Sequence, residues 1–408
     1  MTEAGSPVEI SGLEVVGYSD VGGRPPFKLA VWRDRGRWFL ACGHLWHRGW
    51  SILDVTDPAD PRPVSWLEGP ADTWSCQVNV ADGLLLGGLA KVSPKWGGRE
   101  GASFEEAAQV WDVRDPWSPR LRSQIRMGGT GSHRNFWAGG RYAHLASNAA
   151  GFDHYLYVIV DLADPDRPVE VSRWWLDGQG PGESVPPGED GLSLHGPAYV
   201  VGDRAYLSYG GGGMVILDVS DLGRPGLISR WRPSPPFKGG FFGAGVHTAR
   251  PLIGRDLAVV HGEAGAEHCA EPLNLAGIVD IADPAAPWLV STFPVPFPGP
   301  GLGYTSYCDK GGRFGPHNSH LPQGHPDLDA DEDTVYLTWF CGGLRVYDIR
   351  DARTPREVAH FVPPDPTVRH GPLPASALVA QSEDVIVDAR GIIYVTEKNG
   401  GVHLLRRT

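Results

Sequence analysis

The chain has 408 residues, a net charge of -12 at pH 7 and a hydrophobic share of 41%, which is enough for a substantial core. The acidic charge and the lack of a long basic cluster make nucleic acids and anionic membrane surfaces poor partners. No CxxC motif, secretion signal or membrane-length apolar run is present, so we expect a cytoplasmic protein with reduced thiols.

A short motif recurs along the chain at intervals of roughly 50 to 70 residues, a period that suits a propeller blade. Each copy is a β-branched run, an aspartate-rich turn that usually contains proline, and a second apolar run. This order predicts a β-hairpin whose aspartate side chains bond the amides of the turn. The first aspartates of the copies are Asp54, Asp112, Asp161, Asp218, Asp280 and Asp348.

Another pair of apolar runs precedes each hairpin, so each repeat is expected to hold four strands. The last repeat stops after three strands, and residues 8–20 resemble the missing fourth. Closing the ring in this way would remove exposed strand edges. We therefore predict a single all-β domain over residues 1–408, a seven-bladed β-propeller whose last blade is closed by the N-terminal strand. The expected blades are residues 21–68, 69–128, 129–177, 190–233, 240–297, 312–364 and 374–408.

The third strands of these repeats resemble a known family. "VIVDLADP" (158–165), "VILDVSDL" (215–222) and "GIVDIADP" (277–284) are similar to the repeat of the LVIVD-repeat proteins. The resemblance covers nearly the whole chain and implies a seven-bladed β-propeller. It implies no particular activity, because one fold can carry many functions.

A histidine opens the innermost strand of several successive blades. These residues are His133, His195 and His247, followed by His317 or His320 in the sixth blade, where His317 is slightly preferred. Equivalent inner-strand positions converge on the propeller axis at one face. Four imidazoles meeting there would suit a divalent transition metal such as Fe, Mn or Zn. Each histidine taken alone is more typical of a hydrogen-bonded structural residue, but their restriction to one arc of blades favours a shared metal site.

Further residues near the same face are candidates for catalysis and substrate binding. Glu263 would orient an imidazole or move a proton, and Glu383 at the start of the seventh inner strand would act beside the metal. Lys28, the counterpart in the first blade, would neutralise an anionic substrate group. Aromatic residues that would line an apolar pocket, each equally consistent with ordinary packing, are Trp74, Phe136, Phe242 and Tyr304.

These residues predict a metal-dependent enzyme that acts on a small organic molecule in the central pocket, with lyase, isomerase or hydrolase chemistry. A second hypothesis keeps the same ligands with Fe(II) and dioxygen, by analogy with the carotenoid-cleavage oxygenases, whose motifs this chain lacks. A third is a non-catalytic propeller that binds a protein or a glycan. The sequence does not indicate an oligomeric state.

Overall fold

The computed structural model describes the chain except for residues 1–7, 102–103, 235–236, 238–244 and 273. The strands of its first half form four-stranded antiparallel meanders that single residue pairs, His44 with Ser75 and Ala90 with Gly131, join into one sheet. These strands are β3 (Pro26–Asp34), β4 (Arg37–His44), β5 (Gly49–Asp54) and β6 (Arg62–Glu68), then β7 (Thr73–Ala81), β8 (Leu84–Lys91), β9 (Glu106–Asp112) and β10 (Arg120–Arg126), then β11 (Gly131–Phe136), β12 (Tyr142–Asn148), β13 (Leu156–Asp161) and β14 (Val169–Trp174).

The second half forms separate four-stranded sheets. Two of them are β15 (Tyr199–Val201), β16 (Arg204–Ser208), β17 (Met214–Asp218) and β18 (Gly226–Trp231), and then β19 (Thr248–Leu252), β20 (Leu257–His261), β21 (Ala276–Asp280) and β22 (Trp288–Thr292). The last strands are β23 (Thr334–Thr338), β24 (Leu344–Asp348) and β25 (Arg356–Val362), and then β26 (Ser382–Val387), β27 (Ile393–Glu397) and β28 (Val402–Arg407). On the inner side of β23 there is no regular strand among the described residues; Ser319 instead forms an isolated bridge with Leu337 of β23.

The N-terminal segment divides into two strands instead of forming the single strand expected over residues 8–20. β1 (Glu9–Ser11) pairs with β25, and β2 (Leu13–Ser19) pairs with β28. Gly12 separates them with a φ of 65°, a left-handed conformation that glycine adopts without steric cost. The segment therefore extends two neighbouring sheets, and its second part occupies the place predicted beside the last three strands.

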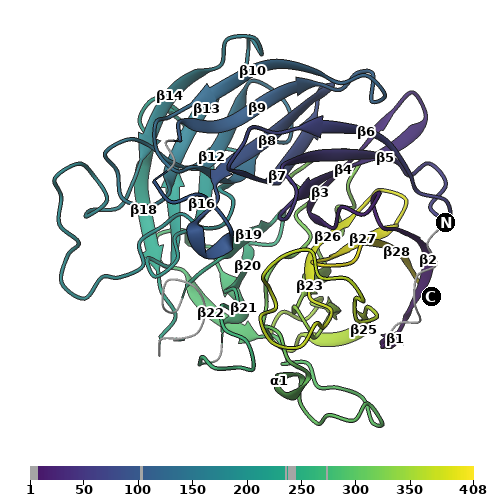
Figure 1. Cartoon of the computed structure of the whole chain (residues 1–408). Coiled ribbons are helices and arrows are strands. Elements are labelled where there is room, and N and C mark those ends of the chain that lie inside the picture. The colour runs from purple at the N-terminus through teal and green to yellow at the C-terminus, as the bar shows by residue number, and fades with distance from the viewer. Residues whose placement is uncertain (1–7, 102–103, 235–236, 238–244, 273) are drawn as a thin grey trace.

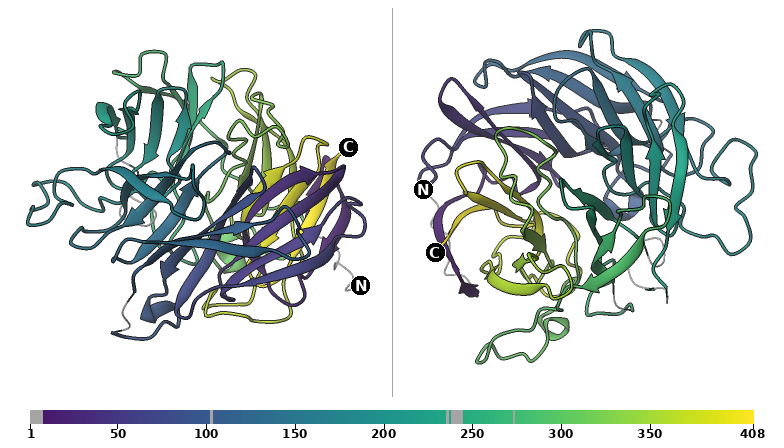
Figure 2. Two further views of the ribbon diagram at one scale, coloured as in Figure 1. Left: turned by 90° about the horizontal axis from the view of Figure 1, so that it is seen from above. Right: turned by 180° about the vertical axis from the view of Figure 1, so that it is seen from behind.

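The sheets are arranged around a centre, so the protein is an all-β β-propeller. In Figure 1 the outer strands β6, β10, β14 and β18 lie at the periphery, while β3, β7, β19 and β26 lie nearer the middle. The two views in Figure 2 show the same arrangement from above and from behind. The helical turns η1 (Pro94–Trp96) and α1 (Tyr307–Lys310) lie in connections. No helix among the described residues has the length and apolar character needed to span a membrane.

Burial explains why the third strand of each repeat carries the β-branched motif. In β17 the residues from Met214 to Leu217 are all buried, because this strand packs against neighbouring sheets on both faces. The outermost strand β18 is partly exposed along most of its length. The core of the molecule therefore lies between adjacent sheets.

The repeated aspartates act as the sequence predicts. In every copy, one carboxylate oxygen accepts a hydrogen bond from the backbone amide two residues later; for example, Asp218 Oδ1 accepts from Ser220 N at 2.8 Å. The motif is thus a turn-forming element at the end of the third strand.

The expectation of reduced thiols is wrong for two cysteines. Cys269 and Cys308 form a disulfide although they lie 39 positions apart in the sequence. Their connections meet only in the folded chain, so no short spacing motif marks the pair. Cys42, Cys76 and Cys341 are free and buried, and the cytoplasmic location remains a prediction.

Candidate functional site

Four of the predicted histidines form an arc at the centre of the propeller. The ring centroids of His133 and His195 lie 4.6 Å apart, those of His195 and His247 lie 5.2 Å apart, and those of His247 and His317 also lie 5.2 Å apart. The backbone explains this placement for three of them. The amides of His195, His247 and His317 donate to Ser208 O, His261 O and Thr338 O, which are the last residues of β16, β20 and β23.

His320 lies outside the arc and has a structural role. Its Nε2 atom bonds Asp329 O at 2.8 Å, and its Nδ1 atom accepts from Val387 N at 3.2 Å. Both ring nitrogens are therefore used by the backbone. Of the two alternatives in this blade, the structure brings His317 to the other histidines.

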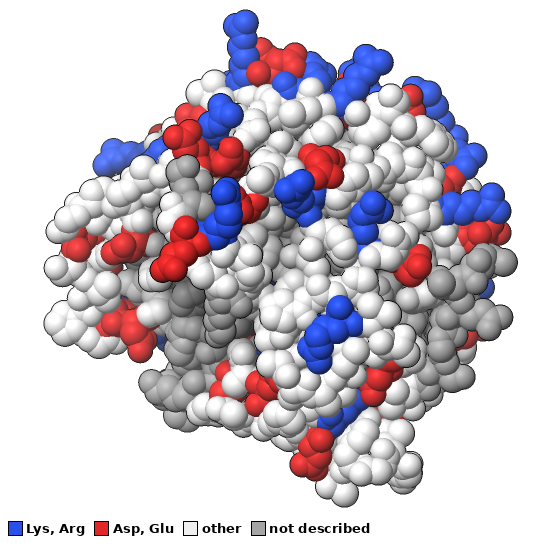
Figure 3. Space-filling model, viewed as in Figure 1, with Lys and Arg blue, Asp and Glu red and all other residues white. Residues whose placement is uncertain are grey.

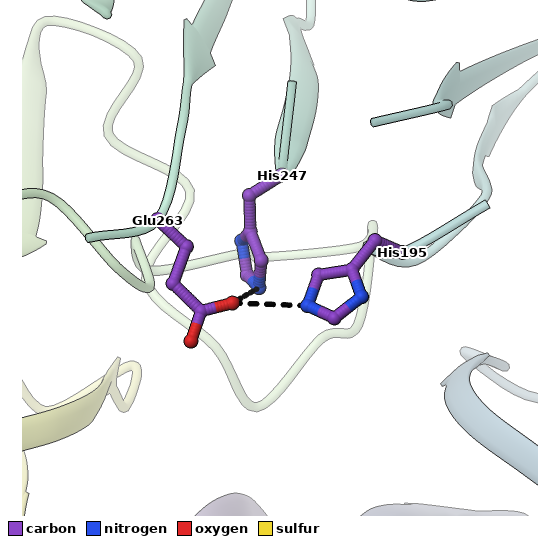
Figure 4. A group of neighbouring side chains, drawn as sticks. All are labelled: His195, His247 and Glu263. Atoms are coloured by element: carbon purple, nitrogen blue, oxygen red, sulfur yellow. Dashed lines mark hydrogen bonds and ion pairs between the residues drawn. The ribbon is translucent and has the colours of Figure 1, made fainter. Parts of the chain in front are cut away.

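Glu263 occupies the middle of the arc, whereas the sequence predicted a carboxylate that would orient an imidazole or move a proton. One of its oxygens, Oε2, lies 2.9 Å from His195 Nε2 and 3.5 Å from His247 Nε2, as Figure 4 shows. The other oxygen, Oε1, lies 3.1 Å from Arg313 Nη1 and 3.5 Å from His317 Nε2. A single carboxylate thus contacts three imidazoles and one guanidinium. It reaches this point because it follows β20 directly, two residues after His261.

The protonation states at this cluster follow from burial and from the close carboxylate. Burial lowers the pKa of His247 and of His133 well below the ordinary value, and burial also lowers the pKa of His317. Burial alone would raise the pKa of the Glu263 carboxyl, but His317 and the hydrogen bond with His195 hold it well below its usual range. Near pH 7 the imidazoles of His133, His247 and His317 are therefore neutral and Glu263 is an anion.

Glu383 lies behind His317 and away from the pocket. Its carboxylate is 2.6 Å from Lys398 Nζ, 3.1 Å from His317 Nδ1 and 3.5 Å from Arg313 Nη2. Burial would raise the pKa of Glu383, but Lys398 and His317 lower it to about 2. Burial in turn lowers the pKa of Lys398 to about 8. Glu383 is therefore placed to orient His317 through its second ring nitrogen.

Arg134 is a cation of the site that the sequence analysis did not single out, although it directly follows His133. Its side chain is buried, with 2% of the residue exposed, and its Nη2 atom contacts His247 Nε2 at 2.9 Å. Within the described part of the chain, no carboxylate pairs with it, and its Nε and Nη1 atoms have no hydrogen-bond partner. An arginine in a strand gives no sequence signal for burial, because arginine is usually exposed.

A pocket of about 230 Å³ opens onto the cluster. Cationic side chains, histidines and the Glu263 carboxylate form most of its polar part, and aromatic side chains form much of the remainder. Its principal lining residues are Phe27, Trp74, Trp96, His133, Arg134, Tyr155, His195, Glu263, Arg313 and Lys398. The pocket therefore combines a charged end with apolar walls.

The other predicted pocket residues have different positions. Trp74 lines the pocket, whereas Phe136 packs against Tyr199 with ring centroids 5.0 Å apart. Tyr304 packs against Tyr307, and Phe242 lies outside the described residues.

Lys28 does not line this pocket. Its Nζ atom pairs with Asp384 Oδ1 at 2.5 Å and borders a separate cavity of about 40 Å³. Arg134 lines both this cavity and the larger pocket, so it stands between them.

Comparison with known proteins supports the fold. The LVIVD repeat model matches residues 199–232 and 275–294, which include β15 to β18 and β21 to β22. The chain carries LVIVD repeats. No curated protein matches it. The LVIVD match thus concerns the strands of the scaffold, and the histidines and Glu263 lie outside the matched residues.

Two solved structures are similar in fold to nearly the whole chain. One is a chain of a mitotic checkpoint complex, with 9% identity, a TM-score of 0.55 and coverage of 100% of this chain and 97% of the other. The second is a chain of an S. cerevisiae assembly that contains dbp5, nup159, gle1, IP6 and ADP, with 10% identity, a TM-score of 0.54 and coverage of 99% and 96%. At these identities the likeness shows the fold alone.

The donor set fits a divalent transition metal. The ligand atoms of His195, His247 and Glu263 all lie within 4.8 Å of one another. Two ligand atoms on opposite sides of one such ion lie roughly 4.0–4.4 Å apart, so a small inward movement would bring them to bonding distance. Two neutral nitrogens and one carboxylate also match the preferences of Fe, Mn and Zn. His247 must first release its contact with Arg134, because one lone pair on Nε2 cannot serve both.

Proposed function

We propose that this chain is a seven-bladed propeller whose axial pocket holds a divalent transition metal and catalyses a reaction of a small organic molecule. Two groups of contacts support the closed ring. β2 pairs with β28, and Asp384 in β26 accepts from Leu29 N at 2.9 Å and pairs with Lys28 in β3. The first contact adds an N-terminal strand to the last meander, and the Asp384 contacts link that meander to the first one.

The observation that carries the metal proposal is the buried group of His195, His247 and Glu263, with its ligand atoms within 4.8 Å of one another. We assign these residues as ligands and place His317 beside them as a further donor, which leaves His133 for another role. A divalent cation bound there acts as a Lewis acid toward a substrate oxygen. The other roles belong to the chain: Arg313 holds Glu263 in place, and Glu383 orients the His317 ring.

His133 is the best candidate for moving a proton. It lines the pocket, and its Nδ1 atom is buried without a hydrogen-bond partner in the part of the chain that the structure describes. Burial lowers its pKa well below the usual value, so the ring is neutral near pH 7 and carries one nitrogen with a free lone pair, the form that a general base requires. This role suits lyase, isomerase or hydrolase chemistry. Glu383 is fully buried and bound to Lys398, which makes it a positioning residue.

One observation favours a second candidate function, a non-haem Fe(II) oxygenase. Two histidines and one carboxylate are also the donor set of the iron site in many such oxygenases. Oxygen uptake by iron-loaded protein in the presence of substrate would support this candidate, and turnover without oxygen would exclude it.

Metal analysis tests the proposal directly. Purified protein is stripped with EDTA and loaded in turn with Fe(II) without oxygen, Mn(II) or Zn(II), and the bound metal is then counted. We expect about one ion per chain in the wild type and a strong loss in His195→Asn. The matched control is His154→Asn, which replaces an exposed histidine. Failure of the wild type to retain any of the three ions would overturn the proposal and favour a non-catalytic binding propeller.

A further inference from the structure

The charges around the pocket do not balance. Arg313 contacts both Glu263 and Glu383, and Lys398 contacts Glu383, so these two cations share two anions. Arg134 lines the same pocket and pairs with no carboxylate among the described residues. One positive charge therefore remains without a counter-charge. On the face shown in Figure 3, by contrast, acidic and basic side chains are interspersed.

Arg134 also has unused hydrogen-bond donors. Its Nη2 atom donates a hydrogen bond to His247 Nε2, while Nε and Nη1 are buried and unpartnered within the described residues. A buried, unpaired guanidinium is costly unless a ligand supplies an anion. The planar donors of a guanidinium match the two oxygens of a carboxylate.

The rest of the pocket indicates what the anion is attached to. Phe27, Trp74, Trp96 and Tyr155 supply aromatic walls, and the volume is about 230 Å³. Pockets for drug-sized ligands are roughly 300–1,000 Å³, so a smaller molecule is indicated. Trp74 and Trp96 meet edge to face with ring centroids 5.2 Å apart, which gives a preformed surface for a flat apolar group.

We propose that the pocket recognises a small organic carboxylate with an aromatic or similarly flat apolar body, and that Arg134 binds its carboxylate group. This inference names the substrate class of the proposed enzyme and rests on that function for its catalytic meaning. The binding itself needs only Arg134 and the pocket walls.

The contact between Arg134 and His247 adds a consequence. The guanidinium now donates to His247 Nε2, the atom assigned to the metal. A carboxylate that draws the donors of Arg134 to itself frees this lone pair. Carboxylate and metal should therefore strengthen each other's binding, by the same factor in both directions.

The test uses the whole chain after EDTA treatment and measures binding by isothermal titration calorimetry. The probes are phenylacetate, its neutral isostere phenylacetamide, and acetate, which lacks the apolar body. We expect phenylacetate to bind roughly tenfold or more tightly than either of the others, because phenylacetamide lacks the charge that strengthens the hydrogen bonds to Arg134 and acetate lacks the apolar body. Equal affinity for phenylacetamide, or no binding of phenylacetate up to roughly 10 mM, would overturn the inference.

Variants locate the binding group. Arg134→Gln should weaken phenylacetate binding by roughly tenfold or more. Arg134→Lys, which keeps the charge but lacks the planar pair of donors, should have an affinity between those of the wild type and Arg134→Gln. Arg167→Gln changes an exposed arginine and serves as the control. Unchanged affinity in a folded Arg134→Gln protein would exclude Arg134. If that variant does not fold, Arg134→Lys and the comparison of phenylacetate with phenylacetamide in the wild type still decide the question.

The same titrations separate this inference from the metal proposal. Phenylacetate binding to metal-free protein supports the carboxylate site even if no metal is retained. Metal retention without phenylacetate binding supports the metal site alone. Where both occur, phenylacetate should tighten metal binding in the wild type, and this effect should be lost in Arg134→Gln.

Discussion

Replacing Glu383 by glutamine tests the buried charge network that supports the arc of histidines. The carboxylate contacts Lys398, Arg313 and His317 at 2.6, 3.5 and 3.1 Å and is fully buried. Removing one partner of a buried ion pair costs about 3–5 kcal/mol when the remaining group must stay charged. Lys398 can instead lose its proton and become neutral, because burial already lowers its pKa to about 8.

The cost of deprotonating Lys398 limits the expected loss of stability. Deprotonating a lysine of pKa about 8 at pH 7 costs roughly 1.4 kcal/mol, and Arg313 keeps its contact with Glu263. We therefore expect Glu383→Gln to lower the free energy of unfolding by about 2–3 kcal/mol at pH 7. Above pH 8 Lys398 is neutral in the folded wild type as well, so the difference between the two proteins should shrink there.

Acid should remove the same contribution from the wild type. The pKa of Glu383 is lowered to about 2 in the folded protein, whereas an unfolded glutamate titrates near 4.5. Its stabilising effect is thus complete above about pH 4.5 and is lost as the pH falls from there toward 2. Glu383→Gln has no carboxyl at this position and should lose less stability over that window.

Urea unfolding, followed by tryptophan fluorescence at pH 4, 7 and 9.5, measures these differences. Glu170→Gln is the matched control, because it removes the same charge from a contact of 2.5 Å with Arg173 on the half-exposed strand β14. An exposed pair contributes about 0–1 kcal/mol, so little change is expected there. If Glu383→Gln costs no more than Glu170→Gln at pH 7, the buried network does not stabilise the protein and the assignment is wrong.

Three further predictions concern the closure of the ring, the disulfide and the metal. Gly17→Ala in β2 should destabilise the protein by about 1–3 kcal/mol, because a Cβ there would overlap the carbonyl oxygen of Pro58. The control, Gly226→Ala, should change the melting temperature little, because a Cβ there meets no atom within 4 Å. Equal shifts in the two variants would contradict the packing of β2. Reducing the disulfide between Cys269 and Cys308 should lower the free energy of unfolding by at most about 4 kcal/mol, and with it the melting temperature, because the bond closes a loop between residues 39 positions apart. Free thiols in all five cysteines of the non-reduced protein would show that the bond is absent. Removing the proposed metal should lower the melting temperature, and adding it back should restore it, whereas a melting temperature indifferent to all three ions would count against the site.

Local features of the sequence were sufficient for the scaffold. The repeated aspartates bond turn amides two residues away, so their role depends only on nearby backbone and can be predicted from the motif. The histidine positions were also predictable, because strands at equivalent places in a repeat are placed equivalently around the axis. For this reason His133, His195 and His247 could be grouped from their spacing alone.

The tertiary structure decided which charges meet at the centre. His317 joins the arc, whereas the ring nitrogens of His320 are taken by the backbone of Asp329 and by that of the distant Val387. Glu263 reaches the middle of the cluster, and Arg134 is buried against His247. These outcomes depend on distances between different sheets, which hydrophobic periodicity does not encode. Isolated charged residues in a sequence are also expected at the surface, so their burial becomes visible only when the sheets are assembled around one axis.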